Sequence, residues 1–269
     1  MSNIYKALSI AGTDPTGGAG IHADLKTFQE QRVYGMAVIT SVVAQNTLGV
    51  KSFEEVSIEN ISEQIDCVFE DIIPDAVKTG MLASQSIIEL IANKLKKNEV
   101  KLYIMDPVMV AKSGHHLLHE EAISSLKALL IPLATIITPN IPEAEVIIGK
   151  NIHTINDMRN AAKEIVEVYG AKAAVIKGGH MQGEARDILY HNGEIKEFSS
   201  ARYNTVNTHG TGCTFSAVIT AELAKNNSIE DSVKTGKEFI SQAIQKTLNI
   251  GKGQGPTNHF AYNEKNKGY

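Results

Sequence analysis

Short apolar runs alternate with amphipathic segments along the chain, and this alternation limits the possible folds more than any other feature. The apolar runs, rich in Val, Ile, Leu and Ala, are 7–12, 36–44, 75–78, 102–105, 135–138 and 173–176. Segments with apolar residues at helical spacing are 21–31, 62–72, 84–97, 120–130, 157–169, 214–224 and 229–248. Strands that are apolar throughout are typical of a parallel sheet buried on both faces. We therefore expect an α/β fold, with a central mainly parallel sheet flanked by helices on both faces.

No change of composition marks a linker between domains. The stretch 187–198 alternates in polarity around Asn192-Gly193, a dipeptide that favours a two-residue hairpin turn. We expect this hairpin at one edge of the sheet. The chain, residues 1–269, is then a single domain, because α/β folds of this length often form one.

The charge balance and the cysteines restrict the partners and the compartment. The chain has 26 basic and 30 acidic residues, a formal net charge of −4, so we expect neither nucleic acid nor an anionic membrane as a partner. The longest apolar stretch, 128–137, contains Pro132 and is too short for a membrane helix. The start of the chain lacks a secretory signal pattern, and Cys67 and Cys213 lack metal-ligand spacing. A reducing cytoplasm is the compartment that we expect.

Polar and glycine-rich residues follow the predicted strands. They are Gly12-Thr13-Asp14, Ala44-Gln45-Asn46, Lys78-Thr79-Gly80, Asp106-Pro107, Thr138-Pro139-Asn140 and Lys177-Gly178-Gly179. In open α/β sheets, ligands bind beyond the carboxyl ends of the strands, and those ends would meet at one rim. Each segment alone is weak evidence, but together they predict a site at that rim.

The segment from Thr208 to Cys213 reads Thr-His-Gly-Thr-Gly-Cys and leads into a predicted helix. Its glycines allow a tight turn that directs backbone N–H groups outward at the helix N-terminus, and such a cradle binds anions. The same electrostatic field would lower the pKa of Cys213. An ordinary glycine-rich loop with a buried, inert cysteine explains these residues as well, so both interpretations stay open at this point.

The earlier glycine-rich loop, 17–20, does not fit a nucleotide-binding motif. It lacks the G-x-G-x-x-G spacing, and no G-x-x-x-x-G-K-[ST] sequence occurs in the chain. Phosphate binding then falls to the loop around Gly210. The first loop would approach the other substrate, with Asp24 one helical turn further on, although a capping or exposed role for Asp24 is the simpler alternative.

Two carboxylates that follow different strands, Asp106 and Glu143, could serve a metal ion. Oxygen ligands of this kind suit Mg²⁺, bound directly or through water, and Asn140 lies close to Glu143 in the chain. Lys177 ends a buried strand and could reach a phosphate. A helix carboxylate in the first turn after Pro142 is the alternative for Glu143, and a surface lysine is the alternative for Lys177.

Taken in order, these segments resemble the hydroxymethylpyrimidine/phosphomethylpyrimidine kinases of thiamine biosynthesis, within the ribokinase-like superfamily. The segments that carry the resemblance are 12–20, 23–26, 78–81, 106–109, 138–140 with Glu143, 177–180 and 210–213. The resemblance implies a cytoplasmic, homodimeric enzyme that uses ATP and Mg²⁺. It would phosphorylate 4-amino-5-hydroxymethyl-2-methylpyrimidine, and then phosphorylate the monophosphate to the diphosphate.

The resemblance also implies roles by position. Cys213 corresponds to the catalytic base, and the backbone of Gly210, Thr211 and Gly212 to the anion hole. Asp106 and Glu143 correspond to the magnesium-associated carboxylates. The residues on the ATP side are Lys177, Asn140 and Thr208. The residues of the pyrimidine pocket are Gly12, Asp24, Gln45 and Met81.

Several rival functions remain on the same fold. Many ribokinase-like sugar kinases have Asp at the position of Cys213, which argues against sugar substrates. Gln45 offers a donor and an acceptor side by side, which matches an aminopyrimidine edge better than a pyridoxal ring. A pyridoxal or pyridoxine kinase of the same family is the alternative, and a non-catalytic nucleotide- or vitamin-binding regulator is another. The stretch 110–114 is either a lid over the phosphates or a plain surface loop.

Overall fold

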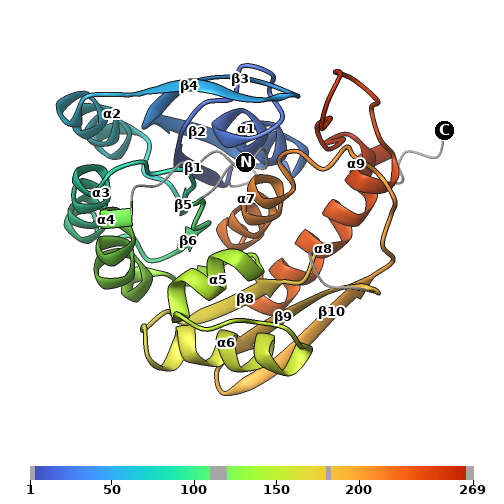
Figure 1. The fold of residues 1–269 in the computed structure, drawn as a ribbon. Coiled ribbons are helices and arrows are strands. Elements are labelled where there is room, and N and C mark those ends of the chain that lie inside the picture. The colour runs from blue at the N-terminus through green and yellow to red at the C-terminus, as the bar shows by residue number, and fades with distance from the viewer. Residues whose placement is uncertain (1–3, 110–119, 180–182, 265–269) are drawn as a thin grey trace.

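The computed structural model describes residues 4–109, 120–179 and 183–264 (Figure 1). The main sheet contains β1 (Lys6–Ala11), β2 (Tyr34–Ile39), β5 (Ala76–Thr79), β6 (Tyr103–Met105), β7 (Ile136–Ile137), β8 (Ala173–Lys177), β9 (Ala185–His191) and β10 (Glu194–Ser200). These eight strands lie in the order β10-β9-β8-β7-β6-β5-β1-β2. The pairs from β2 to β8 are parallel, so the prediction of a mainly parallel sheet is confirmed.

The predicted hairpin extends one edge of this sheet. β9 pairs antiparallel with both β8 and β10. At the turn, Asn192 has φ 51° and Gly193 has φ 79°. Both residues are in the left-handed region, which a type I′ turn requires and which Asn and Gly tolerate best.

Helices cover both faces of the sheet (Figure 1). On one face lie α1 (Gly20–Glu30), α7 (Thr211–Ala224) and α8 (Ile229–Gln245); on the other lie α2 (Ile58–Asp71), α3 (Gln85–Lys97), α4 (Glu120–Ser125), α5 (Ile141–Ile148) and α6 (Ile155–Glu167). The short helix α9 (Ala261–Glu264) follows near the described C-terminal end. The side chains of neighbouring strand residues pack in opposite cores: Ala7 packs on the side of α7, and Leu8 packs on the side of α3. This alternation explains why the strands are apolar throughout.

The prediction of one strand over 36–44 is wrong, because the chain leaves the main sheet at Thr40. The backbone N–H of Thr40 donates to Ala11, and its buried hydroxyl donates to the carbonyl oxygen of Met81. The next residues form β3 (Ser41–Asn46), which pairs antiparallel with β4 (Gly49–Glu55) in a separate two-stranded sheet. The sequence analysis missed β4 because most of its residues are exposed and several are charged.

Several helix boundaries also differ from the predictions, two of them in ways that change the local structure. The helix expected over 120–130 changes after Ser125 to a π-helical turn (Leu126–Leu130) and then a 3₁₀ turn (Ile131–Leu133) that contains Pro132. The helix expected from residue 214 begins at Thr211, within the glycine-rich loop. Within the described ranges, none of the helices has the length and apolar character to cross a membrane.

Replacement of Ile104 on β6 by Ala should test the core. The side chain is fully buried between central strands and α7, so Ile104→Ala should lower the free energy of unfolding by about 2–5 kcal/mol. Ile73 is 65% exposed, and Ile73→Ala should change it by less than about 0.5 kcal/mol. Urea denaturation of both variants makes the comparison. Equal losses would show that β6 does not lie in the core.

Candidate active site

A cavity of about 670 Å³ lies at the carboxyl ends of the parallel strands. Its wall comes from the residues that follow β1, β5, β6 and β8, from the start of α7, and from Val43, Gln45 and Val50 on β3 and β4. Of the residues to which the family resemblance gives roles, all except Asp24 line this cavity. The predicted gathering at one rim is therefore what the fold produces.

The cradle, residues 210–213, opens the helix α7 toward the cavity. Gly210 precedes the helix with φ 80°, and no side chain caps the helix N-terminus. A Cβ atom on Gly210 would lie 1.7 Å from the carbonyl oxygen of Gly18, so only glycine allows this contact between the two glycine-rich loops. The uncapped N–H groups and the helix dipole together make an anion-binding end.

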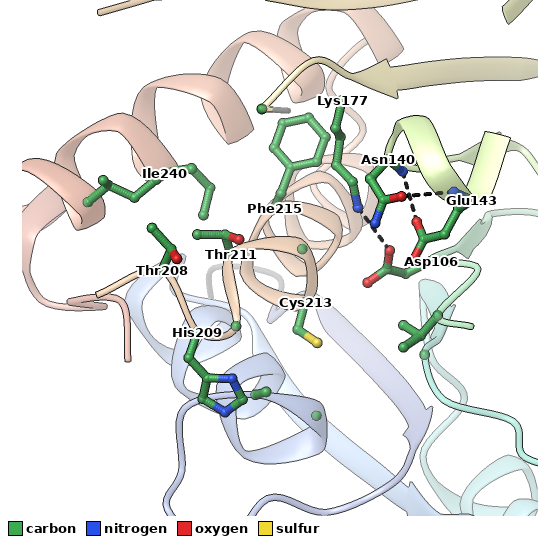
Figure 2. Close-up of a pocket in the computed structure, with 18 of the residues that line it drawn as sticks. Asp106, Asn140, Glu143, Lys177, Thr208, His209, Thr211, Cys213, Phe215 and Ile240 are labelled. Atoms are coloured by element: carbon green, nitrogen blue, oxygen red, sulfur yellow. Dashed lines mark hydrogen bonds and ion pairs between the residues drawn. The ribbon is translucent and has the colours of Figure 1, made fainter. Parts of the chain in front are cut away.

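Lys177 and Asp106 lie next to the cradle (Figure 2). The ammonium nitrogen of Lys177 is 3.2 Å from Oδ1 of Asp106, which is 2% exposed. A Cβ atom on Gly212 would lie only 3.3 Å from that nitrogen. Burial opposes the charge of Lys177, but Asp106 and Glu143 raise its pKa. A positive charge is therefore held beside the anion-binding end of α7.

Asn140 and Glu143 form a capping box at the start of α5. Oδ1 of Asn140 accepts a hydrogen bond of 2.9 Å from the N–H of Glu143, and Oε2 of Glu143 accepts one of 2.8 Å from the N–H of Asn140. The helix-terminus interpretation of Glu143 is thus correct, although both residues also line the cavity. Burial raises the pKa of Glu143 to about 7; Lys177 opposes this rise and Asp106 adds to it.

The two carboxylates, Asp106 and Glu143, fit a divalent cation that arrives with a phosphate. Among the described residues, no cluster of three or more His, Cys, Asp or Glu side chains could hold a metal alone. Mg²⁺ usually takes one or two carboxylates and completes its ligands with water and phosphate oxygens. A cation would also relieve the repulsion between the two buried carboxylates, which Lys177 balances only in part.

Gly12, Met81, Val43 and Gln45 form another part of the wall. A Cβ atom on Gly12 would lie 3.2 Å from the sulfur of Met81 and 3.6 Å from Val43, so glycine leaves room there. The register of β3 shifts between Ala44 and Gln45, and Gln45 lines the cavity. Gln45 was predicted at the rim of the main sheet; it lies instead on the two-stranded sheet.

Asp24 is not in the cavity wall, against the prediction. Its carboxylate is fully buried, lies 2.6 Å from the ammonium of Lys78, and accepts a hydrogen bond of 2.6 Å from Ser9. Burial disfavours the charge of Lys78, but Asp24, Cys213 and Asp106 together outweigh this and raise its pKa. Lys78 does line the cavity. Asp24 therefore acts on the site through Lys78, which was named among the residues at the strand ends but was given no role.

Cys213 does not have the lowered pKa that the sequence analysis predicted. Burial raises the pKa of its thiol to about 12; Lys78 acts in the opposite direction, and Asp24 and Asp106 add to the rise. The N–H of Gly20 donates to the sulfur. The prediction considered the helix N-terminus and missed the cost of burying a charge, which is larger here.

The remaining wall of the cavity was not predicted. It includes Phe215, Ile240, Tyr203 and the ion pair of Asp187 with Lys237, whose oxygen and nitrogen lie 2.9 Å apart. These residues come from β9, α7, α8 and a loop, and no local motif marks them. The predicted lid, 110–114, and residue 180 of the resemblance lie outside the described residues.

Comparison with known proteins identifies relatives across almost the whole chain. The family model for phosphomethylpyrimidine kinase matches residues 14–258. The hydroxymethylpyrimidine/phosphomethylpyrimidine kinase of Bacillus subtilis is 48% identical over 262 residues, which cover 97% of this chain and 96% of that protein. A thiamine biosynthesis bifunctional protein of Geobacter sulfurreducens is 44% identical over 254 residues, 94% of this chain and 52% of that protein.

A solved structure shares the fold along nearly the whole chain. The ADP complex of Bacillus subtilis pyridoxal kinase superposes with a TM-score of 0.90 and 40% sequence identity, and covers 97% of this chain and 100% of that one. The fold, the order of the motifs and the matching family model agree. The chain therefore belongs to the phosphomethylpyrimidine kinase family.

Proposed function

We propose that this chain transfers the γ-phosphoryl group of ATP to the hydroxymethyl oxygen of 4-amino-5-hydroxymethyl-2-methylpyrimidine, and then phosphorylates the monophosphate, in thiamine biosynthesis. The observation that carries the proposal is the single cavity that holds the cradle, Lys177, two carboxylates and the wall around Gln45. The kinase from Bacillus subtilis is named for the same two acceptors, and the Geobacter protein is named for the same pathway.

The cavity wall suggests where each substrate binds. The cradle and Lys177 suit the ATP phosphates, with Asn140 and Thr208 nearby in the wall. The apolar side chains of Phe215 and Ile240 suit the nucleotide base. The wall around Gly12, Met81 and Gln45 suits the pyrimidine ring, and Cys213 lies between these parts.

Transfer would depend mainly on position and charge. Mg²⁺, held by Asp106 and Glu143 when it is bound, would neutralise negative charge on the phosphates. Lys177 and the N–H groups of the cradle would stabilise the charge that develops on the transferred group. To accept the hydroxyl proton, Cys213 would have to act from its thiolate form, which its burial disfavours and the positive charge of Lys78 favours.

The assembly and the compartment are further parts of the proposal. We infer that residues 1–269 act as one kinase domain, because strands from β1 to β10 share one eight-stranded sheet and the cavity lies at its rim. The homodimer and the cytoplasmic location rest on the family resemblance and on the two unpaired cysteines, Cys67 and Cys213. Light scattering of the purified protein would measure the oligomeric state.

A pyridoxal kinase is the second candidate, because a protein of that name shares the fold. Initial rates with ATP and Mg²⁺ should be highest for the hydroxymethylpyrimidine, lower for pyridoxal and undetectable for ribose. Gln45 is the physical reason, since its carboxamide pairs with an aminopyrimidine edge. A faster rate with pyridoxal would favour the second candidate, and no rate with any alcohol would refute a small-molecule kinase.

Cys213→Ala should lower the turnover of the hydroxymethylpyrimidine by about two to four powers of ten, the usual contribution of a general base. Nucleotide binding should change little, because the backbone donors of the cradle remain. The control is Cys67→Ala, since Cys67 is exposed and outside the cavity wall. Steady-state kinetics and calorimetric titration with AMP-PCP give both quantities. Near-normal turnover in Cys213→Ala would exclude Cys213 as the base.

Gln45→Met should reduce the preference for the aminopyrimidine over pyridoxal by about 1–3 kcal/mol, because one partner of a buried polar pair is lost. The ratio of kcat/KM for the two acceptors measures this preference. Val42→Met places the same side chain on an exposed position of β3 and should leave the ratio unchanged. An equal loss for both acceptors would show that Gln45 supports the fold and does not read the ring.

A further inference from the structure

A partly buried hydrogen bond joins the two glycine-rich loops. Nε2 of His209 lies 2.8 Å from Oδ2 of Asp14, and Asp14 has no exposed surface. His209 directly precedes the cradle in the chain, and Figure 2 shows its imidazole. The proposed reaction gives neither side chain a role, although both belong to the segments that define the site.

Asp14 determines the shape of the first loop. Its Oδ1 accepts hydrogen bonds from the N–H and the hydroxyl of Thr16, at 2.9 and 2.8 Å. Its Oδ2 accepts from the N–H groups of Gly18 and Ala19, at 3.1 and 2.8 Å. Burial alone would raise the pKa of Asp14, but the bonds from His209 and Thr16 lower it to about 2. An ionised carboxylate therefore holds residues 14–19 in one conformation.

His209 is held from its other side by the C-terminal segment. The backbone N–H of His209 donates to the carbonyl oxygen of Gly255 at 3.0 Å, and the carbonyl oxygen of His209 accepts from the backbone N–H of Thr257 at 3.1 Å. A Cβ atom on Gly18 would lie 2.7 Å from Cδ2 of His209 and 2.9 Å from Pro256. The imidazole thus packs against the first loop with no room for a larger residue at position 18. These contacts fix the position of the His209 backbone relative to the first loop.

We propose that Asp14 and His209 are a positioning pair that holds the cradle in register with the acceptor subsite; this inference rests on the proposed kinase reaction. Gly210 follows His209 directly, and its backbone touches that of Gly18. On the acceptor side, the same loop includes Thr13, which is bonded to the backbone of Ser41 and Val43. The pair therefore joins the segment that holds the transferred phosphoryl group to the segment that holds the hydroxyl oxygen.

The test compares two amides of different length at position 209. Gln places its amide nitrogen about as far from the backbone as Nε2 of His, whereas Asn is one bond shorter and cannot reach Asp14. His209→Asn should lower kcat about 10- to 100-fold and leave KM for the pyrimidine nearly unchanged, because a shift of about 1 Å in a reacting group has a cost of this size. His209→Gln should recover most of the rate. His153→Ala, at an exposed histidine outside the cavity wall, is the control.

Amide hydrogen exchange tests the pair without any substrate. The peptide 208–216, which contains the cradle, should exchange faster in His209→Asn than in the wild type, and His209→Gln should resemble the wild type. Exchange in the core strand β6 should stay unchanged in both variants. If His209→Asn does not fold, His209→Ala replaces it as the variant whose side chain cannot bond to Asp14.

The two readouts separate the failure of this inference from the failure of the proposed function. A wild type without kinase activity would refute the proposed reaction, and the exchange of peptide 208–216 would still test whether the pair holds the cradle. Equal kcat and equal exchange in the Asn and Gln variants would overturn the positioning role. Loss of kcat in both variants with unchanged exchange would also overturn it, since the imidazole would then act on the phosphates directly.

Discussion

The cavity depends on buried charge beneath the N-terminus of α7. Two lysines, Lys78 and Lys177, lie close to three carboxylates, Asp24, Asp106 and Glu143. Each of these groups is wholly or largely buried. Buried charges are costly unless they are paired, and here each lysine has a carboxylate within 3.2 Å. The helix end adds positive potential to the same place. The resulting site is preorganised for a phosphate chain that brings its own cation.

The apolar cores on the two faces of the sheet supply the stability that offsets the cost of these buried charges. The parallel strands carry apolar side chains to both helical layers, and α7 is buried along nearly its whole length. Asp106 and Lys177 lie where strands end and Lys78 lies near the end of β5, whereas Asp24 comes from α1 and Glu143 from α5. The position of Lys78 and Asp106 therefore follows from the length of β5 and β6, so errors in strand register would move the charges as well as the core.

The sequence predicted the layers and the rim because both depend on local patterns. Continuous apolar strands indicated the parallel sheet, and the residues after them were predicted to meet. It failed where a neighbour far along the chain decides the outcome. Thr40 turns the chain out of the sheet through bonds to Ala11 and Met81, and Asp24 turns away from the cavity because Lys78 lies 54 residues later. The prediction of a lowered pKa for Cys213 was wrong for the same reason, because the burial of its thiol depends on the whole fold.

The central claim is that one site performs two successive transfers, first to an alcohol and then to its monophosphate. The second acceptor is largely ionised near neutral pH, so it needs no strong base, and the cradle favours anionic oxygen. The direct measurement follows monophosphate and diphosphate over time with purified protein, ATP in excess, Mg²⁺ and the hydroxymethylpyrimidine. We expect the monophosphate to rise first and then to be converted to the diphosphate. Accumulation of monophosphate without any diphosphate would contradict it.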